Sequence, residues 1–129
     1  MSSEPLTGSF DFPDGSNYTG QYTRDDSGVI KRHGHGHFKG QGFEIQGDFE
    51  ADHPVNAVLT FSSDIKYEGT FEQGKFSGMG TMTWPTSAKY EGAWANGQPH
   101  GEGKFTDAEG REYVGVFVNG TGPGLHAVQ

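Results

Sequence analysis

Three histidines at alternate positions are the first feature of this sequence that could carry chemistry. They lie in residues 32–38 (RHGHGHF), so half of the chain's 6 histidines fall within one short stretch. Imidazole is a frequent zinc ligand and titrates near neutral pH, which suggests a metal site or a pH-sensitive contact. On an extended strand, however, alternate side chains lie about 6.8 Å apart. That spacing is wide for three ligands on one Zn²⁺, whose bonds to nitrogen are about 2.1 Å long.

Carboxylates form a second candidate cluster in residues 48–53 (DFEADH). On one strand, Asp48, Glu50 and Asp52 would share a face, with His53 beside them. The spacing of an EF-hand calcium loop is absent, and no nucleophile motif or phosphate-binding loop occurs elsewhere. A solvated strand face that ends in a turn explains the cluster better. We therefore expect no catalytic residue, metal, cofactor or small-molecule substrate, and no enzymatic activity.

The composition argues against several classes of protein. The 129 residues carry a net charge of -8 and the 9 basic residues are scattered, so we expect no nucleic-acid ligand. With 22 glycines, 10 Phe, 5 Tyr and 2 Trp, an architecture of aromatics and glycines is favoured over aliphatic layers. Cysteine is absent, so disulfides are not expected. No secretory leader or apolar run of roughly 20 residues is seen, and a cytoplasmic protein is expected.

A repeat of 23 residues organises the chain. Its clearest copies begin at Tyr67, Tyr90 and Tyr113, and each has an aromatic residue four positions later. Glycines recur at fixed columns, and less regular copies extend the pattern toward the N-terminus. A repeat of this length predicts a row of similar supersecondary units. The glycines that define it are Gly20, Gly47, Gly69, Gly74, Gly78, Gly80, Gly92, Gly97, Gly101, Gly103, Gly115, Gly120 and Gly124.

The repeat predicts a single domain over residues 1–129, made of about five units. One degenerate unit has Asp52, Asn56 and Val58 where other copies have glycine. The unit before it carries about five extra residues around 23–31. The predicted units are a partial one at 8–17, an insertion-bearing one at 18–44, the degenerate one at 45–66, regular ones at 67–89 and 90–112, a truncated one at 113–124, and a tail at 125–129.

Each unit has the pattern of a β-hairpin. In residues 67–71 (YEGTF), aromatic and polar residues alternate with period two. Asn-Gly pairs and clusters such as PDGS and PTSA supply turns between successive strands. Glycines on the aromatic face would let rings of a neighbouring strand lie across them. The predicted fold is an all-β, elongated, twisted single-layer antiparallel sheet of about ten strands, with little or no helix.

The spacing Y-x-G-x-[FW]-x-x-G-x-x-x-G-x-G in residues 67–80 and 90–103 resembles the MORN repeat (membrane occupation and recognition nexus). The resemblance covers about 8–124 and is stronger over 67–124, where it is also similar to small MORN proteins of cilia. It implies a twisted single-layer sheet of successive hairpins and a role in protein–protein assembly. Small proteins of this type recur in cilia and flagella, including radial spokes and other axonemal complexes. No catalytic residue belongs to the repeat, so none is carried over.

The leading hypothesis is a non-enzymatic scaffold or adaptor within a larger assembly. We expect it to bind other proteins of a multi-subunit axonemal complex through an aromatic groove or a sheet edge. Tyr and Trp are good anchors for such contacts when they are partly exposed. The predicted groove residues are Tyr18, Tyr22, Tyr67, Phe71, Trp84, Tyr90, Trp94, Tyr113 and Phe117.

The alternative hypothesis is a peripheral membrane adaptor that binds phospholipid through the repeat sheet. Lysines recur near repeat positions, but glutamates neighbour them and indicate a surface of mixed charge. The repeat register also bears on the histidines, because residues 32–38 align with residues 99–105 (PHGEGKF). His33 then matches His100, and the other two match a carboxylate and an ammonium on the polar face. A surface row is therefore the preferred interpretation of the histidines.

Overall fold

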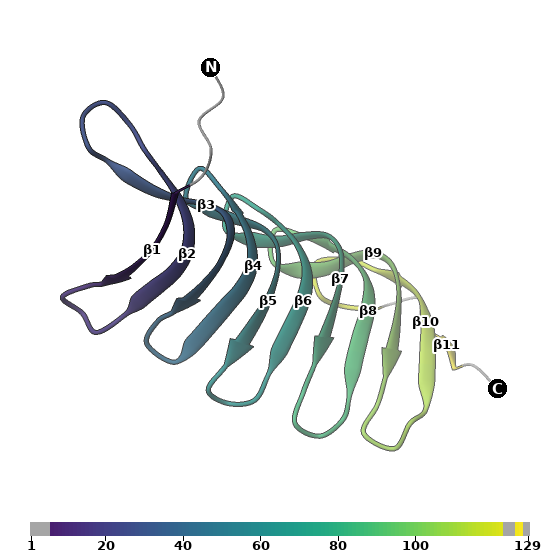
Figure 1. Ribbon diagram of the computed structural model, residues 1–129. Helices are drawn as coiled ribbons and strands as arrows, with labels where there is room; N and C mark the ends of the chain where they lie inside the picture. Colours follow the sequence, from purple (N-terminus) through teal and green to yellow (C-terminus); the bar gives the residue numbers. More distant parts are fainter. Residues whose placement is uncertain (1–5, 123–125, 128–129) are drawn as a thin grey trace.

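The computed structural model describes residues 6–122 and 126–127. They form one antiparallel sheet in which each strand pairs with its neighbours in chain order, curved and twisted in a single layer (Figure 1). No helix occurs among the described residues, and so none that could span a membrane. This confirms the predicted fold class. The strands are β1 (Leu6–Asp11), β2 (Asn17–Arg24), β3 (Ile30–Lys39), β4 (Phe43–Glu50), β5 (His53–Phe61), β6 (Lys66–Glu72), β7 (Lys75–Thr83), β8 (Lys89–Ala95), β9 (Gln98–Thr106), β10 (Glu112–Phe117) and β11 (His126–Ala127).

Turns of one type follow β1, β2, β5, β7 and β9. The first residue of each turn donates its N–H to the carbonyl four residues later, as Trp84 does to Ala88 at 2.9 Å. The fourth residue has a positive φ, which is 91° at Gly15 and 76° at Ser87. This is a type I turn followed by a left-handed residue, a common hairpin connection. The turns begin at Phe12, Asp25, Phe61, Trp84 and Asp107.

Two-residue turns with positive φ at both positions follow β4, β6, β8 and β10. They have the geometry of type I′ turns, whose twist matches that of the flanking strands. Two of them are the predicted Asn-Gly pairs. Asp52, which stands in a glycine column, adopts the same conformation with a φ of 76°. The four pairs are Ala51–Asp52, Gln73–Gly74, Asn96–Gly97 and Asn119–Gly120.

A row of small residues crosses the sheet from β1 to β10, with each member opposite the next. Glycine fills nine of the ten positions and Ala57 fills the one in β5. The register corrects one prediction, because Ala57 and not Val58 occupies this column. The β4–β5 hairpin is one residue shorter than the β6–β7 hairpin, which shifts the column. The row is Gly8, Gly20, Gly36, Gly47, Ala57, Gly69, Gly80, Gly92, Gly103 and Gly115.

Buried tyrosine rings lie across these glycines. A Cβ atom on Gly80 would lie 2.6 Å from Cε1 of Tyr67, far inside van der Waals contact. The Tyr67 hydroxyl passes over the glycine and donates to the Thr70 carbonyl at 2.8 Å. Tyr90 covers Gly103 in the same way. Glycine is therefore required at Gly80 and Gly103 because the ring of the preceding strand occupies the space of a side chain.

The core is built inside the single layer from a motif that spans three strands. A tyrosine on one strand crosses the glycine of the next and meets an aromatic ring on the third, edge to face. The ring centroids are 5.2 Å apart for Tyr67 and Trp94, and 4.7 Å apart for Tyr90 and Phe117. Such pairs contribute about 0.5–1.5 kcal/mol beyond their buried area. Tyr18 repeats the arrangement with Phe49 at 5.6 Å.

The degenerate unit changes both partners of this motif together. Ile45 stands where the other units have tyrosine, and Ala57 stands where they have glycine. Both pack with the same core cluster. Since the shorter Ile45 side chain has no ring to lie across the next strand, the Ala57 methyl group can occupy that space. The unit keeps the architecture with a different pair.

Two features lie at the ends of the repeat pattern. The β2–β3 hairpin contains the predicted insertion, and its strands continue past the regular length to a loop at residues 25–29 (Figure 1). At the other end, a tail was expected at 125–129. Two residues of it, His126 and Ala127, instead pair with Val114 and Tyr113 and add a short edge strand. Gly124, one of the predicted repeat glycines, lies outside the described residues.

Candidate functional site

The histidine row lies on one face of β3, alternating with Gly36 and Phe38 of the aromatic face. His35 and His37 are exposed and point toward β4. The Nδ1 atom of His35 lies 3.4 Å from a carboxylate oxygen of Asp48, and Nε2 of His37 lies 3.6 Å from one of Glu44. Over residues 6–122 and 126–127, no group of three His, Cys, Asp or Glu side chains could hold a metal ion. These two histidines form surface contacts with carboxylates.

His33 has a different, structural contact. Its Nδ1 atom accepts a hydrogen bond of 3.2 Å from the backbone N–H of Ala51 in the β4–β5 turn. His100 accepts one of 3.2 Å from Asn119 in the turn after β10. Because Nδ1 must be unprotonated to accept, both contacts belong to a ring that carries no proton on this nitrogen. His33 and His100, which the repeat register aligns, thus make equivalent contacts.

The carboxylate run at residues 48–53 does not share one strand face, which corrects that expectation. The register of β4 and β5 shifts between Asp48 and Phe49. Asp52 lies in the turn with positive φ, and its carboxylate binds the Arg32 guanidinium at 2.8 Å. The run therefore ends in a turn, and its members have separate partners.

Most of the predicted groove residues form the core, although the Tyr18 ring also borders the cleft described below. Tyr67 has 0% of its surface exposed, and Tyr18 and Tyr90 have 1% each. Large rings that pack against one another across the glycine row leave little surface for a partner. The interpretation of these residues as partner anchors is therefore corrected to a structural role. The buried members of the predicted set are Tyr18, Tyr67, Phe71, Tyr90, Trp94 and Phe117.

The other three predicted groove residues are partly exposed, and Tyr22 lies far from Trp84 and Tyr113. Tyr22 on β2 packs edge to face against Phe10, and Trp84 begins the turn after β7. Tyr113 on β10 donates its hydroxyl hydrogen to a carboxylate oxygen of Asp107 at 3.3 Å. Since β2 and β10 lie near opposite ends of the molecule (Figure 1), Tyr22 does not share a surface with the other two. Trp84 and Tyr113 both lie beside the Phe105 ring, with centroid distances of 6.3 and 6.4 Å.

Burial of the tyrosines also fixes their protonation state. Removal from water raises the pKa of Tyr67 to about 12, since the tyrosinate anion would lose its solvation. The same cause raises the pKa of Tyr18 and of Tyr90. These hydroxyls remain neutral near pH 7 and serve as donors to backbone carbonyls.

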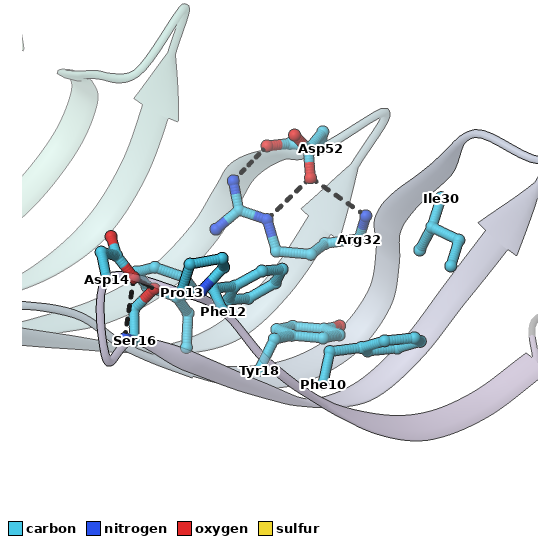
Figure 2. Close-up of a pocket in the computed structure, with 10 residues that line it drawn as sticks. Phe10, Phe12, Pro13, Asp14, Ser16, Tyr18, Ile30, Arg32 and Asp52 are labelled. Carbon is cyan, nitrogen blue, oxygen red and sulfur yellow. Dashed lines mark hydrogen bonds and ion pairs between the residues drawn. The ribbon is translucent and has the colours of Figure 1, made fainter.

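A cleft that the sequence did not reveal lies at the N-terminal end of the aromatic face. Its volume is about 550 Å³, and residues of β1, β2, β3, the β1–β2 turn and the β4–β5 turn surround it. In Figure 2, the Arg32 side chain and Asp52 lie along one side, with the rings of Phe10, Phe12 and Tyr18 along the other. The cleft combines an apolar, mostly aromatic lining with charged groups at its margin.

An ion pair forms the charged side of the cleft. The Nε atom of Arg32 donates to Oδ1 of Asp52 at 2.8 Å, and Nη2 donates to the Asp52 carbonyl at 2.7 Å. The guanidinium carbon also lies 4.9 Å from the ring centroids of both Phe38 and Phe49. Stacking and paired hydrogen bonds of this kind hold an arginine in one orientation.

Two sequence signals could have indicated the cleft. Arg32 faces Tyr22 across the hairpin, and the corresponding residues of later hairpins, Phe76 and Pro99, are apolar. The insertion also falls in this hairpin and no other. A charged residue in an apolar column next to an insertion indicates a local change of function or packing, but the sequence does not show which strands surround it.

Two lysines of the polar face, Lys89 and Lys104, are paired with glutamates. The Lys89 ammonium lies 2.8 Å from a carboxylate oxygen of Glu91, and that of Lys104 lies 3.2 Å from one of Glu112. Exposed pairs of this kind contribute little stability, but they leave a surface of mixed sign. This face is therefore unlike the clustered basic surfaces that bind anionic lipids.

Comparisons with known proteins agree with the repeat pattern in the C-terminal half. No curated protein matches the chain. Two segments, residues 67–89 and 90–110, match the MORN repeat. They contain the whole Tyr67–Gly80–Trp94 motif and the Tyr90 and Gly103 members of the next one, whose third ring, Phe117, follows the second segment. The chain therefore contains two tandem MORN repeats, set in a sheet of hairpins of the same design.

Proposed function

We propose that this protein is a non-enzymatic scaffold or adaptor that binds other proteins within a larger assembly. The observation that carries the proposal is the pair of tandem MORN repeats at 67–89 and 90–110, a repeat class that generally mediates protein interactions. The extended single-layer sheet fits this function, because it offers two faces along its length and an edge strand at each end (Figure 1).

The more specific part of the proposal is that the assembly is a cytoplasmic one in the ciliary or flagellar axoneme, such as the radial spoke. It rests on the resemblance of residues 67–124 to small MORN proteins of cilia. The experiment is affinity purification of the tagged full chain from ciliated cells, with separate fractionation of axonemes. Co-purification of a fixed set of proteins in constant ratio supports the scaffold, and enrichment in the axonemal fraction supports its location.

Two results would contradict these proposals separately. A monodisperse chain that recovers no partner in constant ratio would contradict the scaffold function. A stable complex that stays out of the axonemal fraction would leave the scaffold intact and contradict only the location.

The alternative is recruitment to a membrane through phospholipid. The paired Lys89–Glu91 and Lys104–Glu112 charges weigh against it, since the lysines do not gather on one face without acidic neighbours. Flotation with vesicles of anionic phospholipid tests it directly. We expect no flotation; strong flotation that salt abolishes would favour the membrane adaptor instead.

A further inference from the structure

We propose that the cleft at the N-terminal end of the sheet binds a peptide segment of a partner protein, in which a bulky apolar side chain enters the cleft and a neighbouring basic side chain meets Asp14. This inference rests on the proposed scaffold function and names the chemistry of one partner segment. It is argued from the departure of this hairpin from the others, from the lining of the cleft and from its charge.

The first argument is an internal comparison of the hairpins. The first strand of each hairpin carries an aromatic residue four positions after the tyrosine column. One residue of the second strand is paired with it across the hairpin. The backbone carbonyl of this residue accepts an N–H from the next turn at 2.8 Å for Arg32, 3.0 Å for Phe76 and 2.8 Å for Pro99. The residues at this position, in chain order, are Arg32, Pro54, Phe76 and Pro99. Three are apolar, and only the N-terminal one is charged.

Arg32 leaves open a space that Phe76 fills in the β6–β7 hairpin. Phe76 stacks on Tyr67 with a centroid distance of 3.9 Å and an interplanar angle of 14°. Arg32 instead reaches toward Asp52 and lies against Phe38, so it does not stack on Tyr18 as Phe76 stacks on Tyr67. The cleft of about 550 Å³ lies beside Tyr18 on this side. An apolar group from another molecule can therefore fill a place that the chain itself fills elsewhere.

The second argument is the apolar rim. Phe12 is 41% exposed and Ile30 is 38% exposed, and both line the cleft. The Phe12 backbone is held by a hydrogen bond of 2.9 Å from its N–H to the Ser16 carbonyl. Ile30 follows a loop in which the Asp25 carboxylate accepts N–H bonds from Ser27 and Val29 at 2.9 Å each. Exposed apolar side chains on ordered turns lose little conformational entropy on binding.

The third argument is charge. The Arg32 charge is offset by Asp52, with which it makes two hydrogen bonds. Asp14 remains at the margin of the cleft as an ionised group. Hydrogen bonds from the Ser16 hydroxyl at 2.6 Å and its N–H at 2.9 Å lower the pKa of this carboxyl. With a net charge of -8 on the whole chain, a basic segment is favoured electrostatically over an acidic one.

The experiment begins with a displayed library of random short peptides, selected against the full chain and counter-selected against the Phe12→Ala variant. The expected consensus has an aromatic or large aliphatic residue with Lys or Arg one or two positions away. An acidic consensus, a consensus without a bulky apolar residue, or a library that yields no specific binder would overturn the proposal.

Matched variants then test the site with the selected peptide in synthetic form. Phe12→Ala should weaken its binding by about tenfold or more, because the variant removes an exposed anchor ring. Asp14→Asn should weaken it by roughly threefold and reduce its dependence on salt. Met79→Ala, on the opposite face of β7 and 66% exposed, is the control and should bind as the parent chain does. Equal binding by Phe12→Ala and Met79→Ala would refute the cleft as the site.

Folding does not confound this comparison, since Phe12 and Ile30 are both partly exposed. Ile30→Ala on the opposite rim should also weaken binding of the peptide, as Phe12→Ala does. A normal affinity for the peptide in this second variant would also count against the proposal. Purification of the tagged Phe12→Ala chain separates the inference from the proposed function. If the variant recovers the complex unchanged, only the proposal for the cleft is contradicted. If the parent chain itself recovers no complex, the proposed scaffold function is contradicted.

Discussion

At the scale of single residues, each buried tyrosine meets two structural requirements: apolar contact within the layer and a hydrogen-bond partner for its hydroxyl. The Tyr67 ring covers Gly80 and meets Trp94, which supplies apolar contact where no second layer exists. Its hydroxyl donates to the Thr70 carbonyl of its own strand, so the polar end of the ring is not left unpaired. The residue is therefore a structural element of the sheet, and surfaces elsewhere must contact a partner.

The protonation of Tyr67 predicts how stability depends on alkaline pH. Its pKa of about 12 in the folded chain is above the ordinary value of 10.0, so the unfolded chain releases this proton first. The stabilising contribution is full below pH 10 and is lost as the pH rises through about 12. We expect the urea midpoint of the parent chain to fall over this range, and that of Tyr67→Phe to fall less. Equal losses in the two proteins would show that Tyr67 titrates normally.

At the scale of elements, the hairpin turns explain why the chain repeats. Both turn types place residues at positive φ, and the strands alternate aromatic and polar faces between them. Glycine occupies the left-handed position of the turn at Gly15, Gly28 and Gly110, but Ser87 and Asp64 occupy it in two others. A side chain in the left-handed region costs about 1–2 kcal/mol relative to the right-handed one.

Ser87→Gly should therefore stabilise the folded protein. The gain from relief of the left-handed conformation exceeds the added entropy of the unfolded chain, and we expect a net increase of about 0.5–1 kcal/mol in unfolding free energy. The reciprocal control is Gly110→Ser at the same position of another turn, which should destabilise by a similar amount. Denaturant unfolding measures both; a loss of stability in Ser87→Gly would contradict this account of the turns.

Much of this element structure could be predicted from the sequence, because it depends on local patterns. The period-two alternation around Tyr67 and the turn signals at 85–88 identify hairpins without knowledge of their neighbours. The register of β5 could not be predicted, since a hairpin one residue shorter puts Ala57 in the glycine column. The packing of aromatic rings across the glycines could be predicted as well. That this packing buries most of them too deeply to anchor a partner could not be predicted, because it depends on three successive strands. The cleft depends on five segments that surround Arg32, and no local pattern contains that arrangement.

At the scale of the whole molecule, the sheet is a linear array in which each strand contacts its immediate neighbours. The main core cluster extends from Ala57 and Leu59 on β5 to Phe117 on β10. Tyr18 and Phe49 form a smaller contact nearer the N-terminal end. Stability in such an array is a sum over units and their interfaces, so it varies along the chain.

Hydrogen exchange should reveal this gradient. We expect the slowest amide exchange in β6, β7, β8 and β9, which lie inside the main cluster. Exchange should be faster in β1 at one end and in β10, which is followed only by the two-residue strand β11, near the other. The difference follows from the number of neighbouring units that must open before an amide is exposed. Uniform protection from β1 to β10 would indicate a single cooperative block and would contradict the nearest-neighbour description.

The tyrosine–glycine pairs, in place of a second apolar layer, are what hold this single-layer sheet together. Stability measurements on Gly80→Ala, Tyr67→Ile and their combination test this most directly, because the double variant copies the Ile45–Ala57 pair of the degenerate unit. Gly80→Ala alone should cost about 1–3 kcal/mol from overpacking, and Tyr67→Ile about 2–4 kcal/mol from the lost ring.

The double variant should lose at least about 1 kcal/mol less than the sum of the single losses, since the added methyl group no longer meets a ring. The control combines Gly80→Ala with Tyr18→Ile, whose ring covers Gly36 in a distant part of the sheet. Those two changes should add to within about 0.5 kcal/mol. Additive losses in the Tyr67–Gly80 pair as well would contradict the core described for this sheet.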